Sequence, residues 1–183
     1  MLISQKMNAA INTQIGREYG AMLQYVAIAS YFARESLPEL AAAFHKQAED
    51  ERDHALRFVK YLVDTSARVE IPGINAPQSE FKGFAEAVAL SLKWEQDVTR
   101  QINDLAELGI KESDHLTQTF LQWFINEQLE EITLMETLLR VVERAGPNNI
   151  LMVEDFVLRH RSLGSGKGGD GGRAGKSKGR DKS

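Results

Sequence analysis

Cysteine is absent from this 183-residue sequence, and only four prolines interrupt it. The lack of cysteine excludes disulfides, iron–sulfur clusters and zinc sites built on thiolates, and it agrees with a reducing compartment. No apolar run approaches membrane-spanning length, and the opening MLISQKMNAAINTQ lacks the uninterrupted apolar stretch of a signal peptide. We therefore expect a soluble cytoplasmic protein that has no membrane partner.

The scarcity of proline leaves long stretches with the apolar spacing of helices. Pro38 is favourable at a helix start, whereas Pro72, Gly73 and Pro77 exclude a helix from 67–81. The expected helices span about 4–34, 38–66, 81–108, 113–144 and 148–160. Four long helices, with a long crossover between the second and third, predict an all-α four-helix bundle followed by a short fifth helix.

Three expected helix ends have a local signal in the sequence. Gly109 is expected to stop the third helix, and either Ser113 or Asp114 to cap the fourth. Gly146, which Pro147 follows, predicts a left-handed end to the fourth helix.

Hydrophobic residues make up 43% of the chain, enough for one domain, which we place at 1–162. Residues 163–183 are rich in glycine and carry six Lys/Arg against two Asp, a net charge of +4. Because the whole chain carries −4, the preceding residues are acidic. A segment with so few apolar side chains cannot offset its ordering entropy, so we predict a disordered basic tail.

A glutamate interrupts the apolar stripe of each long helix near its middle. These acids are Glu18, Glu51, Glu95 and Glu127, the last with Glu130 and Glu131 close by. An unpaired carboxylate inside a bundle costs several kcal/mol, and no lysine or arginine occupies these core positions. A multivalent metal ion would neutralise several acids at once, so the pattern predicts a metal centre.

Glu51-Arg-Asp-His54 is the strongest local motif, because Glu-x-x-His on a helix directs a carboxylate and an imidazole to one place. Taken alone, this spacing is common on solvent-exposed helix faces. The acids on the other three helices favour the interpretation as a metal-binding motif. Oxygen-rich ligands with one histidine suit iron or manganese. Glu51 could bridge two metals, with Glu18 and His54 completing one and Glu95 with Glu131 completing the second.

At these residues the chain resembles the ferritin family, specifically the bacterial non-haem ferritins, over about residues 1–160. The family's ferroxidase pattern is met by Glu18, Glu51, His54, Glu95, Gln128 and Glu131, and its redox tyrosine by Tyr25. A third iron position of such ferritins would correspond to Asp50, Glu127 and Glu130. The long crossover is then the ferritin-like connection.

The resemblance implies an iron-storage protein that oxidises Fe(II) with dioxygen or peroxide at a di-iron centre. The Fe(III) mineral would be stored inside a cage of twenty-four subunits, and the fifth helix would support assembly. The related bacterioferritins carry a second Glu-x-x-His and a haem-binding methionine, where this chain has Glu127-x-x-Glu130 and Arg52. No haem is therefore expected.

Other functions stay open at this point. The basic tail would allow nucleic-acid association, but no aromatic residues interleave its charges, so a solubilising role is favoured. Ser162-Leu163-Gly164-Ser165 weakly suggests a docking tag for a larger compartment. A di-iron redox enzyme that acts on an organic substrate is less favoured, because the stripes show no gap of small residues for a substrate pocket.

Overall fold

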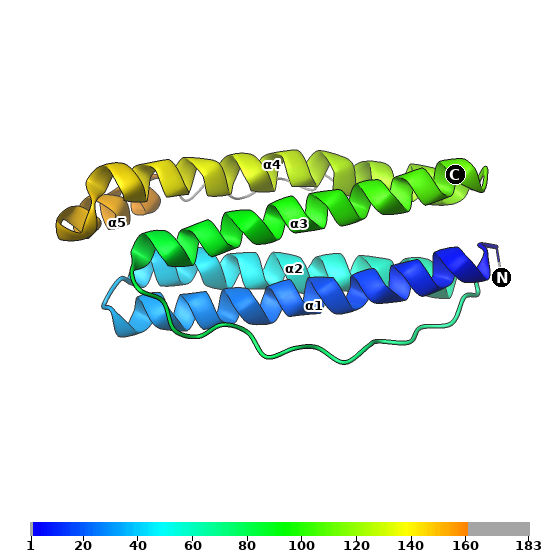
Figure 1. Cartoon of the computed structure of the whole chain (residues 1–183), viewed down its shortest axis with the longest axis horizontal. Helices are drawn as coiled ribbons and strands as arrows, with labels where there is room; N and C mark the ends of the chain where they lie inside the picture. The colour runs from blue at the N-terminus through cyan, green and yellow to red at the C-terminus, as the bar shows by residue number, and fades with distance from the viewer. Residues whose placement is uncertain (1, 161–183) are drawn as a thin grey trace, which may run out of the picture.

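The computed structural model describes residues 2–160, which form a bundle of four long helices and a short fifth one (Figure 1). The elements are α1 (Gln5–Arg34), α2 (Pro38–Asp64), α3 (Phe84–Lys111), α4 (His115–Ala145), the 3₁₀ turn η1 (Pro147–Asn149) and α5 (Ile150–Arg159). Within these residues there is no strand, and none of the helices has the length and apolar character to cross a membrane. The predicted all-α fold is confirmed. The tail 163–183, with the functions predicted for it, lies outside the described residues.

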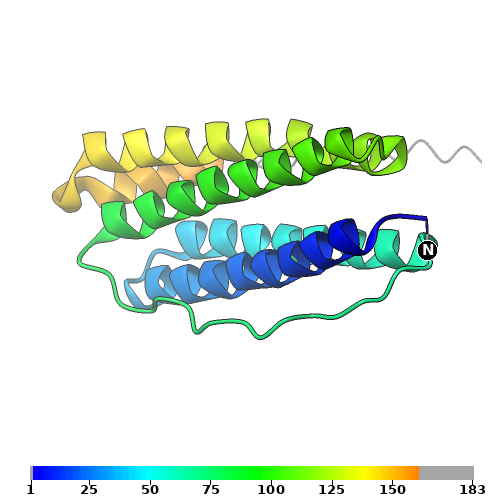
Figure 2. The same ribbon diagram turned by 45° about the vertical axis from the view of Figure 1, so that its right-hand side comes forward.

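The bundle consists of two helical hairpins joined by a long crossover. In both Figure 1 and Figure 2, α1 lies along α2 and α3 lies along α4, while the chain between α2 and α3 runs the length of the bundle beside α1. α5 packs at the end where α2 begins and α4 ends, and it contacts both of those helices. This connectivity is the one predicted from the proline-containing segment.

Serines in the left-handed conformation follow the first three helices. The φ angles of Ser36, Ser66 and Ser113 are 61°, 55° and 54°. After each serine, a backbone N–H bonds to a carbonyl five residues earlier; Leu37 N, for example, donates to Phe32 O at 3.0 Å. This is the Schellman arrangement, in which glycine is the usual left-handed residue.

The prediction that Gly109 ends α3 is wrong. α3 continues to Lys111, and its end is the turn at Ser113, where Asp114 N donates to Gly109 O at 2.8 Å. Gly109 instead lies against α4, and a Cβ added to it would stand 3.3 Å from Gln118 Cγ. A glycine that permits close packing thus produced the same sequence signal as a helix stop.

The starts of α4 and α2 are capped in two different ways. Asp114, one of the two predicted caps of α4, accepts a bond from Thr117 N at 2.9 Å. Leu37, which precedes α2, has no capping side chain. Its place is taken by Glu154 of α5, whose carboxylate oxygens accept bonds from Glu39 N at 2.9 Å and Leu40 N at 2.7 Å. An acid at a helix N-terminus satisfies free N–H groups and complements the helix dipole, so α5 completes α2.

Two amide side chains of α1 hold the crossover in place. Asn12 Nδ2 donates to Arg68 O at 2.8 Å, while its Oδ1 accepts a bond from Glu70 N at 2.6 Å. Gln24 similarly bonds Gln78 O at 2.8 Å and Gln78 N at 2.9 Å. Each amide therefore donates one hydrogen bond to the crossover backbone and accepts one from it, as a paired backbone segment would. Both ends of the crossover are fixed to α1 in this way.

Two glycines lie between these amides, so positions 12, 16, 20 and 24 form one row along α1. A Cβ on Gly16 would stand 2.3 Å from Pro72 Cγ, well inside contact distance. At Gly20 the nearest atoms, on Trp94, are 3.5 Å from such a Cβ. Gly16 is therefore required for the close approach of the crossover, whereas Gly20 is less constrained.

Candidate metal centre

The acids lie where the apolar core is divided in two. One apolar cluster gathers Tyr25, Phe44, Val88 and Met135 toward the α5 end, and the other gathers Ile15, Phe58, Val98 and Phe124 toward the opposite end. Between these clusters every long helix contributes buried polar residues: Glu18, Glu51, His54, Glu95, Gln128 and Glu131. No lysine or arginine is buried anywhere in residues 2–160.

The buried face of α4 is displaced by one position along the chain from the predicted stripe, which included Glu127. It consists of Thr117, Leu121, Phe124, Gln128, Glu131, Met135, Leu138 and Val142, with regular steps of four and three. Glu127, which the sequence places in the apolar stripe of this helix, is only half-buried, and Leu116, three turns earlier on the same face, is 47% exposed. The actual face was obscured because it contains polar Thr117 and Gln128, whose polar atoms are hydrogen-bonded inside the bundle.

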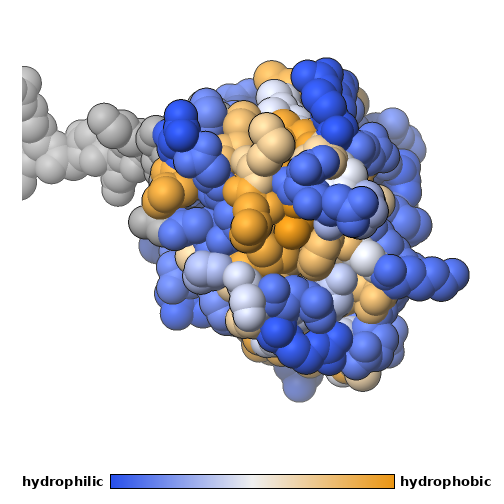
Figure 3. Space-filling view, turned by 90° about the vertical axis from the view of Figure 1, so that its left-hand side faces the viewer, coloured by the Kyte–Doolittle hydropathy of each residue, from blue (hydrophilic) through white to orange (hydrophobic). Residues whose placement is uncertain are grey.

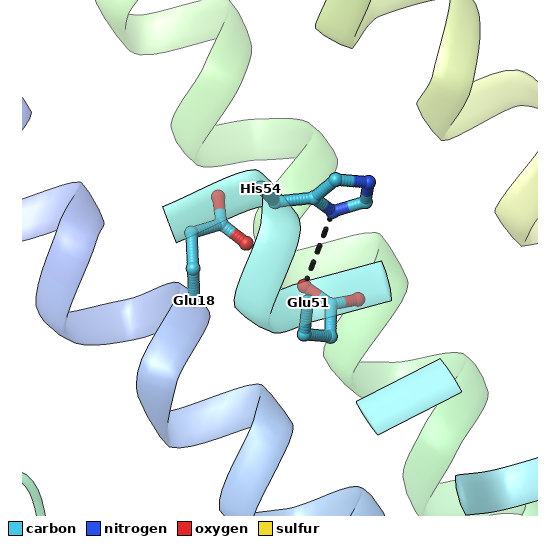
Figure 4. A group of neighbouring side chains, drawn as sticks. All are labelled: Glu18, Glu51 and His54. Atoms are coloured by element: carbon cyan, nitrogen blue, oxygen red, sulfur yellow. Dashed lines mark hydrogen bonds and ion pairs between the residues drawn. The ribbon is translucent and has the colours of Figure 1, made fainter. Parts of the chain in front are cut away.

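Glu18, Glu51 and His54 form the tightest group. Each offers a ligand atom within 4.8 Å of the others, and in Figure 4 the Glu18 carboxylate of α1 points toward the two side chains on α2. His54 Nδ1 lies 3.3 Å from Glu51 Oε2. Glu18 Oε2 is the one buried side-chain oxygen or nitrogen without a hydrogen-bond partner in the described part of the chain. An unpaired buried oxygen beside an imidazole and a second carboxylate fits a cation.

Glu95 and Glu131 lie at the same level but are held by neutral donors. Glu95 accepts bonds from the Tyr25 hydroxyl and from Gln128 Nε2, the latter at 3.1 Å. Glu131 accepts a bond from Gln47 Nε2 at 2.6 Å. Among residues 2–160, neither acid joins a group of ligand atoms as close as that of Glu18.

The residues assigned to a third iron position are not drawn together in this way. Glu130 is exposed, Glu127 is half-buried, and Asp50 forms an ion pair with Lys46.

An aromatic side chain lies beside the histidine of the centre. Trp123 lies edge-on to His54, with ring centroids 5.4 Å apart, while Arg57 stacks 3.9 Å from the Trp123 ring.

Burial raises the pKa of each core carboxyl group. The pKa values of Glu18 and Glu51 lie well above their usual range because both groups are desolvated and each has an acidic neighbour. Burial and the nearby Glu95 raise the pKa of Glu131 to about 8. The pKa of Glu95 is also raised by burial, although bonds from Tyr25 and Gln128 oppose the rise. Without metal, the centre therefore retains protons near neutral pH, and a bound cation would release them.

Two residues of this centre were missed from the sequence. Gln14 donates to Glu18 Oε1 at 2.8 Å, and Gln47 donates to Glu131. Both lie four residues before an acid on their own helix, a spacing that places them on the buried face. That spacing was the available signal.

The fold and this cluster together define a class: four-helix bundles with a candidate carboxylate–histidine metal centre in the core. The comparison with known proteins identifies the family, because the ferritin-like domain matches residues 8–145. The chain belongs to the ferritin family. It is 45% identical over 160 residues to Ferritin BfrB of Mycolicibacterium smegmatis, a match that covers 87% of this chain and 88% of the relative.

Two more distant relatives agree. Bacterial non-heme ferritin of Staphylococcus aureus is 34% identical over 148 residues, covering 81% of this chain and 89% of its own. Among solved structures, an open pore ferritin from the archaeon Archaeoglobus fulgidus superposes with a TM-score of 0.83 at 28% identity. That match covers 85% of this chain and 96% of the archaeal one.

Proposed function

We propose that this protein is a ferroxidase and an iron-storage subunit, with ferrous iron as its substrate. The observation that carries the proposal is the group of Glu18, Glu51 and His54, which is buried, includes an unpaired oxygen and has no compensating lysine or arginine. Membership of the ferritin family supports iron as the metal.

The acids and the imidazole would hold two ferrous ions across the helices. Glu18 and His54 would bind one ion, Glu95 and Glu131 the second, and Glu51 would lie between them. Gln128 donates to Glu95 and would keep it oriented. Two ferrous ions supply two electrons, which together with two protons reduce dioxygen to peroxide. The protonated carboxyl groups are a local source of such protons when iron displaces them.

Tyr25 would take part as a nearby redox group. Its hydroxyl is fully buried and donates to Glu95, and burial together with that carboxylate raises its pKa well above 10. The ring therefore stays neutral while it contacts the centre, and loss of an electron would be coupled to loss of its proton. Asp50, Glu127 and Glu130 remain a proposed third position at the edge of the bundle.

Storage requires a closed shell, because one bundle has no interior volume for a mineral. We propose the cage of twenty-four subunits implied by the family resemblance. At the end of the bundle that carries α5, an apolar surface is ringed by hydrophilic residues (Figure 3). α5 itself exposes two large apolar side chains, Leu151 and Met152, which are 72% and 69% exposed. Assembly would bury these side chains.

The experiment adds ferrous iron in air to the metal-free protein and follows oxidation by absorbance. Size-exclusion chromatography with iron detection then measures iron per particle. Hundreds of iron atoms in a cage-sized peak would support storage, whereas about two per subunit in a small particle would indicate a di-iron redox enzyme instead. Glu51→Gln should abolish the fast oxidation phase, while Glu107→Gln, a change at an exposed acid of α3, should retain it.

A further inference from the structure

Two carboxylates of the centre, those of Glu18 and Glu131, each accept a hydrogen bond from one neutral glutamine amide. Gln14 Nε2 donates to Glu18 at 2.8 Å, and Gln47 Nε2 donates to Glu131 at 2.6 Å. A neutral donor fixes a carboxylate without cancelling its charge, unlike a lysine or arginine. Once a metal ion displaces the proton, no protein cation competes with it for the carboxylate charge.

The orientation of Gln14 is fixed from the far side of its amide. Arg17 Nη1 donates to Gln14 Oε1 at 3.3 Å, so the amide nitrogen must face the interior, where Glu18 accepts its bond. The same nitrogen lies 3.3 Å from Gln101 Oε1. As a result, Oε1 of Glu18 is held by Gln14, whereas Oε2 has no hydrogen-bond partner. The Glu18 carboxylate faces Glu51 and His54 (Figure 4).

Gln47 works between helices. Gln47 belongs to α2, is only 4% exposed and donates a hydrogen bond to Glu131 on α4. This bond connects Glu131 to the helix that carries Glu51 and His54. Gln47 also borders an apolar groove of about 390 Å³ lined by residues of α2, α4 and α5, Phe44 and Leu138 among them. Since that lining is mainly apolar, the amide finds its strong partner in Glu131.

We propose that Gln14 and Gln47 are positioning residues, which set Glu18 and Glu131 in place before a divalent metal arrives. The inference rests on the metal centre of the proposed function, and it assigns a role to two residues outside the ligand set. Removal of an outer-shell hydrogen bond to a metal ligand typically costs 10–100-fold in affinity. We expect losses of about that size for each glutamine.

The test uses the full-length, metal-free protein and cobalt(II) without oxygen. The visible absorption of cobalt reports the number and geometry of its ligands, and the titration gives the affinity of each binding step. Gln14→Met keeps the side-chain length but removes the donor; it should weaken the step that uses Glu18 and shift its absorption bands. Gln47→Met should weaken the step that uses Glu131 and leave the other unchanged.

Gln24→Met is the matched control. Gln24 is also a buried amide of α1, but its hydrogen bonds go to the backbone of Gln78 rather than to a carboxylate. Its replacement should lower thermal stability and preserve both cobalt steps. If Gln14→Met does not fold, Gln14→Asn serves in its place, since the shorter amide is polar but cannot reach Glu18.

The possible results separate the two proposals. Wild-type cobalt affinity and spectra in both glutamine variants would overturn the positioning role. The same loss in Gln24→Met as in Gln14→Met would also overturn it, because the effect would then belong to general packing. A wild-type protein that binds no cobalt would refute the metal centre itself.

Discussion

Glu131 links the chemistry of the centre to the stability of the metal-free protein. Its pKa rises from 4.5 to about 8 on folding, so between these values the folded chain binds more protons than the unfolded one. The stabilising contribution is complete below the unfolded pKa and disappears as the pH rises through the folded pKa. We therefore expect the thermal midpoint of the metal-free protein to decrease as the pH is raised from about 5 to about 9.

Circular dichroism melts across that range, with and without manganese(II), provide the check. Glu131→Gln should flatten the decline, because its amide does not titrate. Saturating manganese should reverse the slope, since metal binding requires ionised carboxylates and stabilises the folded state. A metal-free midpoint that rises steadily with pH would contradict the protonated state of the centre.

Acids are easier to predict from sequence than the residues that hold them. Glu18, Glu51 and Glu95 stand out because an acid on an apolar stripe demands an explanation. Gln14 and Gln47 do not, since a glutamine is equally common on a solvated face. The bond from Gln47 also crosses to another helix, and this pairing depends on how α2 and α4 are rotated against each other.

At the scale of single elements, the left-handed serines are a source of unused stability. A residue with a Cβ pays about 1–2 kcal/mol in this conformation, which glycine avoids. We expect Ser36→Gly, Ser66→Gly and Ser113→Gly each to raise the free energy of unfolding by about 0.5–1 kcal/mol, after the greater chain entropy of glycine is subtracted. Urea denaturation would measure this. Ser36→Ala is the control and should change little.

The row of residues along α1 allows a paired test of the crossover. Gly16→Ala would place a methyl group against Pro72, so we expect a loss of about 1–3 kcal/mol of stability. Gly20→Ala has room for the same group, and its better helix propensity should add up to about 1 kcal/mol. Equal effects in thermal melts of the two variants would show that the crossover is not fixed at Gly16.

Helix boundaries could be predicted only where the residue type indicates a helix end and has no other common structural role. Pro38, Asp114 and Gly146 mark helix ends in the sequence and in the structure, where Gly146 has a φ of 68°. Gly109 misled because glycine serves both for stops and for close helix packing. Ser113 gave no signal of a left-handed turn, since serine rarely adopts one.

For the whole molecule, the exposed part of α5 gives an assembly prediction. Leu151→Asp combined with Met152→Asp should leave the bundle folded but produce smaller particles, because charges would face one another where apolar side chains were to be buried. Sedimentation velocity would show the shift. Glu107→Asp, a conservative change at an exposed position of α3, should sediment like the wild type. A cage of normal size in the double variant would exclude this surface from assembly.

The overall architecture could be predicted because long periodic helices and one proline-containing crossover permit few arrangements. The rotation of α4 could not, because its buried face includes Thr117 and Gln128, which satisfy their polar groups only through neighbours. Periodicity locates a helix along the chain, but contacts with the other three helices decide which residues face inward.

The bond from Glu154 to the start of α2 has a consequence for biosynthesis. The ribosome makes the start of α2 more than a hundred residues before it makes the acid that caps this helix. Until α5 has left the exit tunnel, the first hairpin must exist with an unfinished end. α5 thus completes a helix that is translated much earlier, and a chain released before α5 is made would lack that contact.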